Sequence, residues 1–113
     1  MHINERVVGN VTILDLKGRI TLAEGDRALR DRISHLIQND QKQILLNLAD
    51  VPYIDSAGLG EIVRTYVTVK NRGGQLKLVN LTKRITDLLM ITKLLMVFET
   101  FDTEQDGLKS FSS

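Results

Sequence analysis

The sequence predicts an α/β domain with a mixed four- to five-stranded sheet covered by about four helices. From Val11 to Val79, strand-like apolar runs alternate with helical stripes, and this alternation is typical of parallel strands joined by crossover helices. Before this region, two β-rich runs flank the turn pair Gly9-Asn10, which predicts an antiparallel hairpin. The chain has 113 residues, so we expect one domain with one core over residues 1–113.

The hairpin is expected to consist of a weak strand over Ile3–Val8 and a stronger strand over Val11–Lys17, closed by Gly18. The second run is rich in residues that favour strands and carries apolar side chains on both faces, so we expect burial on both sides towards its end. The sequence places Val11, Ile13 and Asp15 on one face, whereas Leu14 and Leu16 break the alternation.

A first helix follows, with two candidate starts. Thr21 and Glu24 have the spacing of a capping box, whereas Asp26 offers a later cap. The helix is expected to end near Asn39-Asp40, and its apolar stripe consists of Leu29, Ile33, Leu36 and Ile37. Its charged residues alternate in sign, which is more typical of a solvated face than of a phosphate-binding patch. These residues are Asp26, Arg27, Arg30, Asp31 and Arg32.

The rest of the chain continues the alternation. Gln43–Leu48 is almost unbroken in apolar residues, so it is expected to be a central strand. A helix over Ser56–Asn71 is expected next, ending at a left-handed glycine of Gly73-Gly74, and a strand over Gln75–Asn80 follows it. Thr82 is expected to cap a third helix, whose apolar stripe consists of Ile85, Leu88, Leu89 and Thr92. The chain is then expected to form an edge strand over Met96–Glu99 and a short helix that begins at Asp102 or Thr103 and packs Leu108 and Phe111 against the rest of the domain. Ser112-Ser113 are expected to fray.

The segment Leu89–Phe98 is more apolar than one helix stripe requires. One interpretation is that it forms core at the junction of a helix and an edge strand. The other is that Met90, Leu94 or Met96 is exposed in an adaptable partner-binding patch. The sequence leaves both interpretations open.

The segment Tyr53–Gly60 joins the predicted central strand to the following helix, because extended spacing changes to helical spacing across it. Asp55 and Ser56 are therefore expected at a helix N-terminus, where unpaired N–H groups favour an oxygen-bearing group. Partners are expected near this point, because it lies at the carboxyl end of a parallel strand. We expect Asp55 and Ser56 to be accessible, and Gly58 and Gly60 to leave the first turn open to another molecule.

The simplest alternative is that Asp55 or Ser56 is only a helix cap, as in many proteins. No capping box supports this alternative, because Gly58 and Leu59 follow three residues later. Glycine is also a poor helix former, costing about 1 kcal/mol relative to alanine. Two glycines in the first turn therefore favour a site over a purely structural helix start.

The segment Tyr53-Ile54-Asp55-Ser56-Ala57-Gly58-Leu59-Gly60 resembles the signature of the STAS domain, the fold of bacterial anti-sigma factor antagonists. Further matches to the family pattern are Leu46-Asn47-Leu48, Gly73-Gly74-Gln75-Leu76-Lys77-Leu78 and Phe98-Glu99-Thr100-Phe101-Asp102. The resemblance covers nearly the whole chain and implies a single STAS domain. It implies that Ser56 is phosphorylated by an anti-sigma factor that is itself a serine protein kinase, with a serine phosphatase as a further partner. Ala57 leaves Ser56 as the only aliphatic hydroxyl in the motif.

The partner-binding residues that this resemblance implies are Asp55, Ser56, Ala57, Gly58, Leu59, Gly60 and Thr21. Many antagonists carry an aspartate shortly after the second strand, in a Gly-x-Leu-Asp pattern near the kinase-binding face. The matching stretch is Gly18-Arg19-Ile20-Thr21, with Thr21 in place of the acid. The kinase contact is therefore expected to be built differently, or the partner to belong to another subgroup.

Composition excludes several other classes of function. Apolar residues make up 42% and charged residues 26% of the chain, and the net charge of +1 gives no electrostatic reason to expect nucleic acid. Without cysteine, and with only His2 and His35 far apart, we expect neither a metal nor a cofactor. No run has the length of a signal peptide or membrane span, so we expect a cytoplasmic protein without a membrane partner, as a monomer or weak homodimer.

These features favour a binding module switched by phosphorylation. The unmodified chain is expected to bind an anti-sigma factor/serine protein kinase and free a sigma factor, until phosphorylation of Ser56 ends the binding. The alternative of an enzyme lacks a base, because no histidine or lysine lies in the motif and Gly-x-Ser-x-Gly is absent. A third interpretation keeps the fold as a non-enzymatic scaffold or regulatory subunit, in a stress-signalling assembly or a lipid-transport complex.

Overall fold

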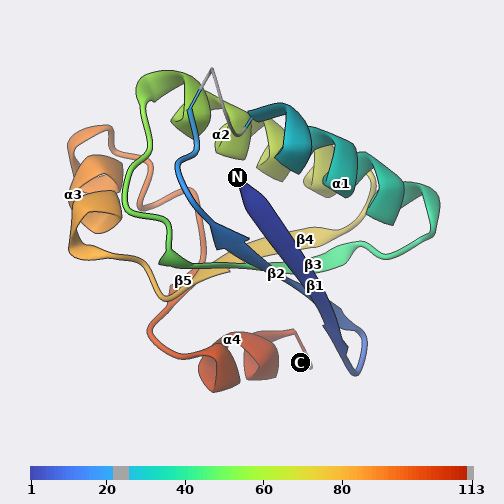
Figure 1. Ribbon diagram of the computed structural model, residues 1–113. Coiled ribbons are helices and arrows are strands. Elements are labelled where there is room, and N and C mark those ends of the chain that lie inside the picture. The colour runs from blue at the N-terminus through green and yellow to red at the C-terminus, as the bar shows by residue number, and fades with distance from the viewer. Residues whose placement is uncertain (22–25, 112–113) are drawn as a thin grey trace.

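Five strands and four helices follow one another in a computed structural model that describes residues 1–21 and 26–111 (Figure 1). The elements are β1 (His2–Val8), β2 (Val11–Lys17), α1 (Asp26–Gln38), β3 (Gln43–Asp50), α2 (Ser56–Asn71), β4 (Gln75–Val79), α3 (Lys83–Ile91), β5 (Thr100–Phe101) and α4 (Glu104–Ser110). The strands form one sheet in the order β1-β2-β3-β4-β5. β1 is antiparallel to β2, and the other neighbouring pairs are parallel. The predicted α/β class with a mixed sheet is confirmed.

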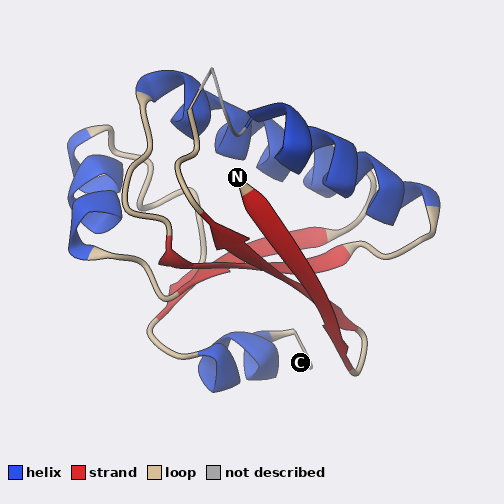
Figure 2. Cartoon of the chain, viewed as in Figure 1, coloured by secondary structure: helices blue, strands red, loops and turns tan. Residues whose placement is uncertain are grey.

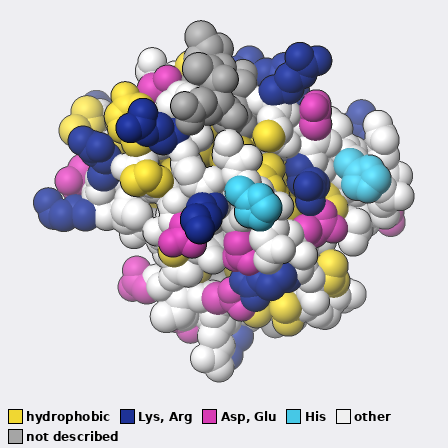
Figure 3. Space-filling model, in the orientation of Figure 1, with side chains coloured by type: hydrophobic (Ala, Val, Ile, Leu, Met, Phe, Trp, Pro, Cys, Tyr) yellow, Lys and Arg dark blue, Asp and Glu magenta, His cyan; other side chains and the backbone are white. Residues whose placement is uncertain are grey.

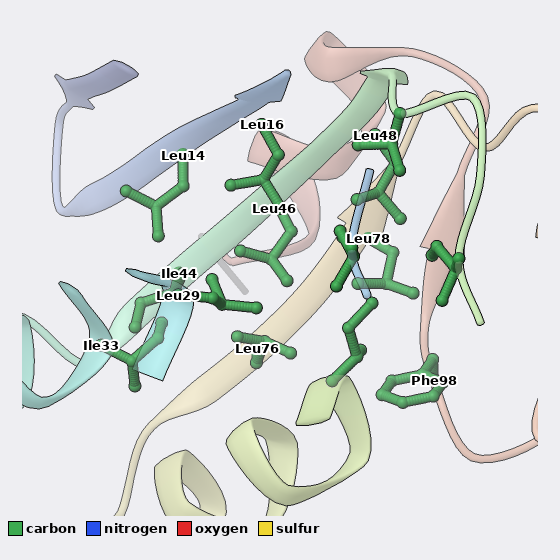
Figure 4. Close-up of a cluster of buried hydrophobic side chains, with 14 of the residues drawn as sticks. Leu14, Leu16, Leu29, Ile33, Ile44, Leu46, Leu48, Leu76, Leu78 and Phe98 are labelled. Atoms are coloured by element: carbon green, nitrogen blue, oxygen red, sulfur yellow. The ribbon is translucent and has the colours of Figure 1, made fainter. Parts of the chain in front are cut away.

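The helices lie on both faces of the sheet (Figure 2). α1, α2 and α3 pack on one face, where leucines and isoleucines of β2, β3 and β4 meet Leu29 and Ile33 of α1 (Figure 4). α4 lies under the opposite face, where Phe111 joins a smaller cluster with Ile13 and Leu45. β3 is central and is buried on both sides, as its apolar run predicts.

The faces of β2 agree with the predicted alternation. Val11 and Ile13 belong to the cluster on the α4 side, whereas Leu14 and Leu16 belong to the larger core under α1 and α2. Asp15 accepts hydrogen bonds from Arg6 of β1, at 2.7 and 2.9 Å. The two leucines interrupt the polar alternation because the sheet is covered on both faces.

Local signals placed most element ends correctly. α2 spans Ser56–Asn71 as predicted, and Gly73 has a φ of +80° just after it. Thr82 caps α3 by accepting from the backbone N–H of Ile85, and Thr103 caps α4 in the same way. The described part of α1 begins at Asp26, and Glu24 of the predicted Thr21–Glu24 capping box lies outside the described residues. The predicted fraying of residues 112–113 also falls outside them.

The charged face of α1, which is predicted to be solvated, also contacts α2. Arg30 of α1 donates to both carboxylate oxygens of Glu61 in α2, at 3.2 and 3.1 Å. Glu61 is only 1% exposed, and Arg64 approaches the same carboxylate at 3.3 Å. A buried carboxylate requires such partners, so Arg30 joins α1 to α2 as well as facing water.

The predicted edge strand over Met96–Glu99 is wrong. The short strand β5 comes later, at Thr100–Phe101, and pairs with the end of β4. Residues 93–98 instead form local turns, in which Leu94 and Leu95 donate to the carbonyl of Leu89. The apolar composition of this segment suited a strand, but its backbone N–H groups form hydrogen bonds within the segment and are not available to pair with the sheet.

The apolar segment around these turns contains both core and surface residues. Phe98 is 4% exposed and contacts the Tyr66 ring edge to face, with centroids 5.1 Å apart. Leu94 is partly buried against the same core. Met90 and Met96 are 59% and 92% exposed, so two of the three candidate surface residues lie at the surface.

Candidate functional site

Asp55 and Ser56 lie where the chain leaves β3 and enters α2. Asp55 is the N-cap of α2, and its Oδ1 accepts from the backbone N–H of Gly58 at 2.7 Å. The backbone carbonyl of Asp55 accepts from Leu59 at 2.9 Å. Asp55 is therefore a helix cap, which gives its carboxylate a defined position beside Ser56.

Ser56 is the first helical residue and is exposed, as predicted. Its hydroxyl has no hydrogen-bond partner within residues 1–21 and 26–111. The hydroxyl of Ser56 is thus accessible to another protein, at a helix N-terminus whose partial positive charge favours an added anion.

Gly58 and Gly60, in contrast, do not have the same environment. A Cβ on Gly58 would lie 1.9 Å from the carbonyl oxygen of Ile20, whereas a Cβ on Gly60 would meet nothing within 4 Å. The expectation that both glycines leave the first turn open is therefore wrong for Gly58, which is buried by the chain itself. It holds for Gly60, which is exposed.

The remaining predicted partner-binding residues are placed unequally. Ala57 is partly exposed beside Ser56, whereas Leu59 is 6% exposed and belongs to the core. Thr21 is partly exposed and follows Ile20, whose backbone N–H donates to Tyr53 and whose carbonyl accepts from Asp55. These backbone bonds bring the segment that contains Thr21 to the motif.

A groove of about 750 Å³ separates the motif from α3. Its motif side comprises residues 53–56, and its α3 side comprises Lys83, Arg84, Asp87, Leu88 and Ile91. The groove thus combines Ser56, apolar side chains and two cationic side chains. Figure 3 shows Lys and Arg side chains next to hydrophobic ones over α3 and the start of α2.

Tyr53 is the centre of a cationic cluster that the sequence analysis did not identify. Tyr53 is 38% exposed, and the centroid of its ring lies 5.9 Å from the Cζ atom of Arg19 and 5.5 Å from that of Arg84. Both distances fit cation–π contacts. Arg84 lies far from Tyr53 in the sequence, so spacing alone gave no signal. The sequence feature that could have found it is the Lys83-Arg84 pair directly after the Thr82 cap.

Other parts of the described surface provide weaker candidates for a functional site. A polar hollow of about 460 Å³ lies at the opposite end of the sheet, between the hairpin turn and the starts of β3 and β4, and contains no residue of the motif. Within the described ranges, no group of three potential metal-ligating side chains comes together. No helix among the described residues is long and apolar enough to cross a membrane.

Known proteins with a similar sequence or fold agree on the family. The STAS domain family profile matches residues 2–107. The anti-sigma-B factor antagonist of Bacillus subtilis (strain 168) is 36% identical over 81 residues, which cover 72% of this chain and 73% of that protein. A crystal structure from Thermotoga maritima, provisionally assigned as an anti-sigma factor antagonist, has a TM-score of 0.88 at 24% identity, covering 96% of this chain and 92% of that one.

A further fold match is SpoIIAA, the Bacillus cell fate determinant, in its phosphorylated form. Its TM-score is 0.74 at 17% identity, over 97% of this chain and 99% of that one. At these identities the two structural matches show the fold, whereas the profile and the Bacillus subtilis relative show the family. On this evidence, together with the observed sheet order and the motif at the start of α2, the chain belongs to the STAS domain family.

Proposed function

We propose that this chain is an anti-sigma factor antagonist controlled by phosphorylation of Ser56. The unphosphorylated chain binds an anti-sigma factor that is a serine protein kinase and so frees a sigma factor. The proposal rests chiefly on the exposed hydroxyl of Ser56 at the start of α2. The similarity to an anti-sigma-B factor antagonist, and to a fold relative solved in a phosphorylated form, supports it.

In this proposal the chain is the substrate of catalysis and acts by binding. The kinase transfers the γ-phosphoryl group of ATP to Oγ of Ser56, which forms a P–O bond and releases ADP and the hydroxyl proton. A serine phosphatase hydrolyses that bond with water and restores the binding form. The chain itself supplies the accessible hydroxyl and the capped helix end that holds it in place.

The physical effect of the phosphate is local. It adds about −1.5 to −2 charges at neutral pH, next to the carboxylate of Asp55. A partner surface fitted to a neutral hydroxyl then meets repulsion and an added desolvation cost. A loss of about 3 kcal/mol at the interface weakens affinity more than a hundredfold. The fold needs no rearrangement, because Ser56 already projects from the domain.

Two variants at Ser56 test the switch. Ser56→Ala removes an exposed hydroxyl, so we expect unchanged partner affinity, no response to ATP, and at most about 1 kcal/mol less stability. Ser56→Asp places a carboxylate at the same point, so we expect much weaker binding, although one carboxylate imitates the phosphate only in part. Isothermal titration calorimetry with the cognate anti-sigma factor kinase measures both affinities.

Phosphopeptide mass spectrometry after incubation with that kinase and ATP identifies the labelled residue. Ser34→Ala is a matched control, because Ser34 is an exposed serine on α1 and its removal should leave labelling unchanged. Label on Ser34, Thr21 or the tail serines with Ser56 unmodified would contradict the proposal. A stable multisubunit assembly that survives phosphorylation would favour the scaffold alternative instead.

A further inference from the structure

Two cationic residues in the first turn of α3 line the same groove as Ser56. Lys83 and Arg84 lie on the α3 side of this groove, and Ser56 lies on the motif side with Asp55. Long cationic side chains therefore border the space into which a group attached to Ser56 would extend. The inference below rests on the proposed function, because it concerns the phosphorylated form of Ser56.

The positive charge of these residues is incompletely neutralised. Arg84 contacts the Tyr53 ring but forms no ion pair with any carboxylate in the described part of the chain, and the same is true of Arg19 on that ring. Lys83 pairs with Asp87 at 3.6 Å, and its side chain is 92% exposed, so this pair is weak. The Arg84 guanidinium, which lines the groove and pairs with no carboxylate among the described residues, favours an added anion nearby.

A phosphate on Ser56 would supply that anion inside the groove. Asp55 and Asp87 line the groove and repel it, whereas Lys83, Arg84 and the N-terminus of α2 attract it. Arginine suits this task, because its planar guanidinium donates two parallel hydrogen bonds to phosphate oxygens. We propose that Arg84, with Lys83 beside it, holds the phosphate of phosphorylated Ser56 in the groove between α2 and α3.

This arrangement changes what phosphorylation does to the partner surface. A phosphate held by Arg84 bridges the motif to α3 and takes up part of a groove whose apolar lining includes Leu88 and Ile91. Ile91 is 80% exposed and lies close to Met90 at the surface. Phosphorylation then closes an apolar contact area as well as adding charge, and it neutralises cations that could attract an acidic partner segment.

The test uses the full chain with phosphoserine incorporated at position 56 during translation, so no kinase is required. A ³¹P NMR titration gives the second pKa of the phosphate in each variant. Removing a nearby cation disfavours the dianion, so Arg84→Ala should raise that pKa by about 0.5 pH unit, and adding Lys83→Ala should raise it further. Arg84→Lys keeps the charge and should restore most of the original value.

Arg19→Ala is the matched control. Arg19 contacts the same tyrosine ring at a similar distance but does not line the groove that contains Ser56. It should therefore change the phosphate pKa by less than about 0.2 pH unit. An unchanged pKa in Arg84→Ala, or an equal effect of Arg19→Ala, would overturn the inference. Failure of the proposed function would be seen separately, as absent kinase labelling of Ser56.

Discussion

Gly58 and Gly60 lie in the same turn of α2 but meet different surroundings. The carbonyl of Ile20 occupies the position where a Cβ of Gly58 would be, because the segment after β2 passes directly over the helix start. Gly60 faces open space. Gly58 therefore allows two backbone segments to approach each other closely. A methyl side chain at Gly60 would contact only solvent.

This difference predicts opposite effects of the same substitution. Gly58→Ala forces backbone apart and should lower the free energy of unfolding by about 3 kcal/mol or more. Gly60→Ala adds a better helix former in free space and should raise it by up to about 1 kcal/mol. Urea unfolding followed by circular dichroism measures both, with Gly60→Ala as the control. Equal stability of Gly58→Ala and the parent chain would show that the approach to Ile20 is not tight.

At the scale of elements, α4 is attached to the sheet by a buried lysine. Lys77 of β4 is 5% exposed and donates to the carbonyl and hydroxyl oxygens of Ser110, at 3.1 and 2.9 Å. Its Nζ lies 3.1 Å from Glu99 and 4.5 Å from the centroid of the Phe111 ring. The ammonium thus joins the end of α4 to the sheet, and its burial is offset by hydrogen bonds and a carboxylate.

Lys77→Ala should loosen α4 more than the rest of the fold. The substitution leaves a cavity under the helix and removes the hydrogen bonds from Lys77 to Ser110, so we expect about 2 to 3 kcal/mol less stability. Hydrogen exchange should accelerate most in Glu104–Ser110 and least in α2. Lys83→Ala is the control, because that side chain is exposed. Uniform acceleration in all helices would show that α4 is not a separately anchored element.

At the scale of the whole molecule, one polar network joins three strands and α4. Arg6 of β1 donates to Asp15 of β2 and to Glu104 of α4, and Asn47 of β3 donates to Asp15 at 2.8 Å. The hydrogen bonds from Arg6 lower the pKa of Asp15 to about 2, although burial opposes the shift. The folded state therefore stabilises the ionised carboxylate of Asp15 relative to the protonated form.

This pKa predicts a loss of stability at acid pH. A depressed folded-state pKa stabilises the fold above the unfolded value of 3.8, and the contribution disappears as pH falls towards about 2. We expect Asp15→Asn to cost about 1 to 2 kcal/mol at neutral pH and much less near pH 2. Urea unfolding of both chains across this range measures the difference. A difference that stays constant with pH would exclude this role for Asp15.

The sequence by itself determined the elements whose signals are local. A β-rich run between Gly9-Asn10 and Gly18 defined β2, an almost unbroken apolar run defined the central β3, and a helical stripe with glycine after it gave α2 its observed bounds. The Thr82 cap located the start of α3, and of the two candidate starts of α4, Asp102 and Thr103, the structure selects Thr103 as the cap. The motif position of Asp55 and Ser56 at a helix start also followed from the sequence, because capping and spacing depend on residues within one or two turns.

Only the tertiary structure decided the features that depend on contacts between distant segments. Nothing near Gly58 in the sequence indicates that the carbonyl of Ile20 fills its Cβ position, and nothing near Ser56 indicates that Arg84 lines its groove. The apolar run that predicted an edge strand over Met96–Glu99 gave no information on whether the backbone would pair with β4 or within local turns. The surroundings of Gly58 and Ser56 depend on the packing of the segment after β2 and of α3 around the start of α2, which a periodic pattern along one segment does not encode.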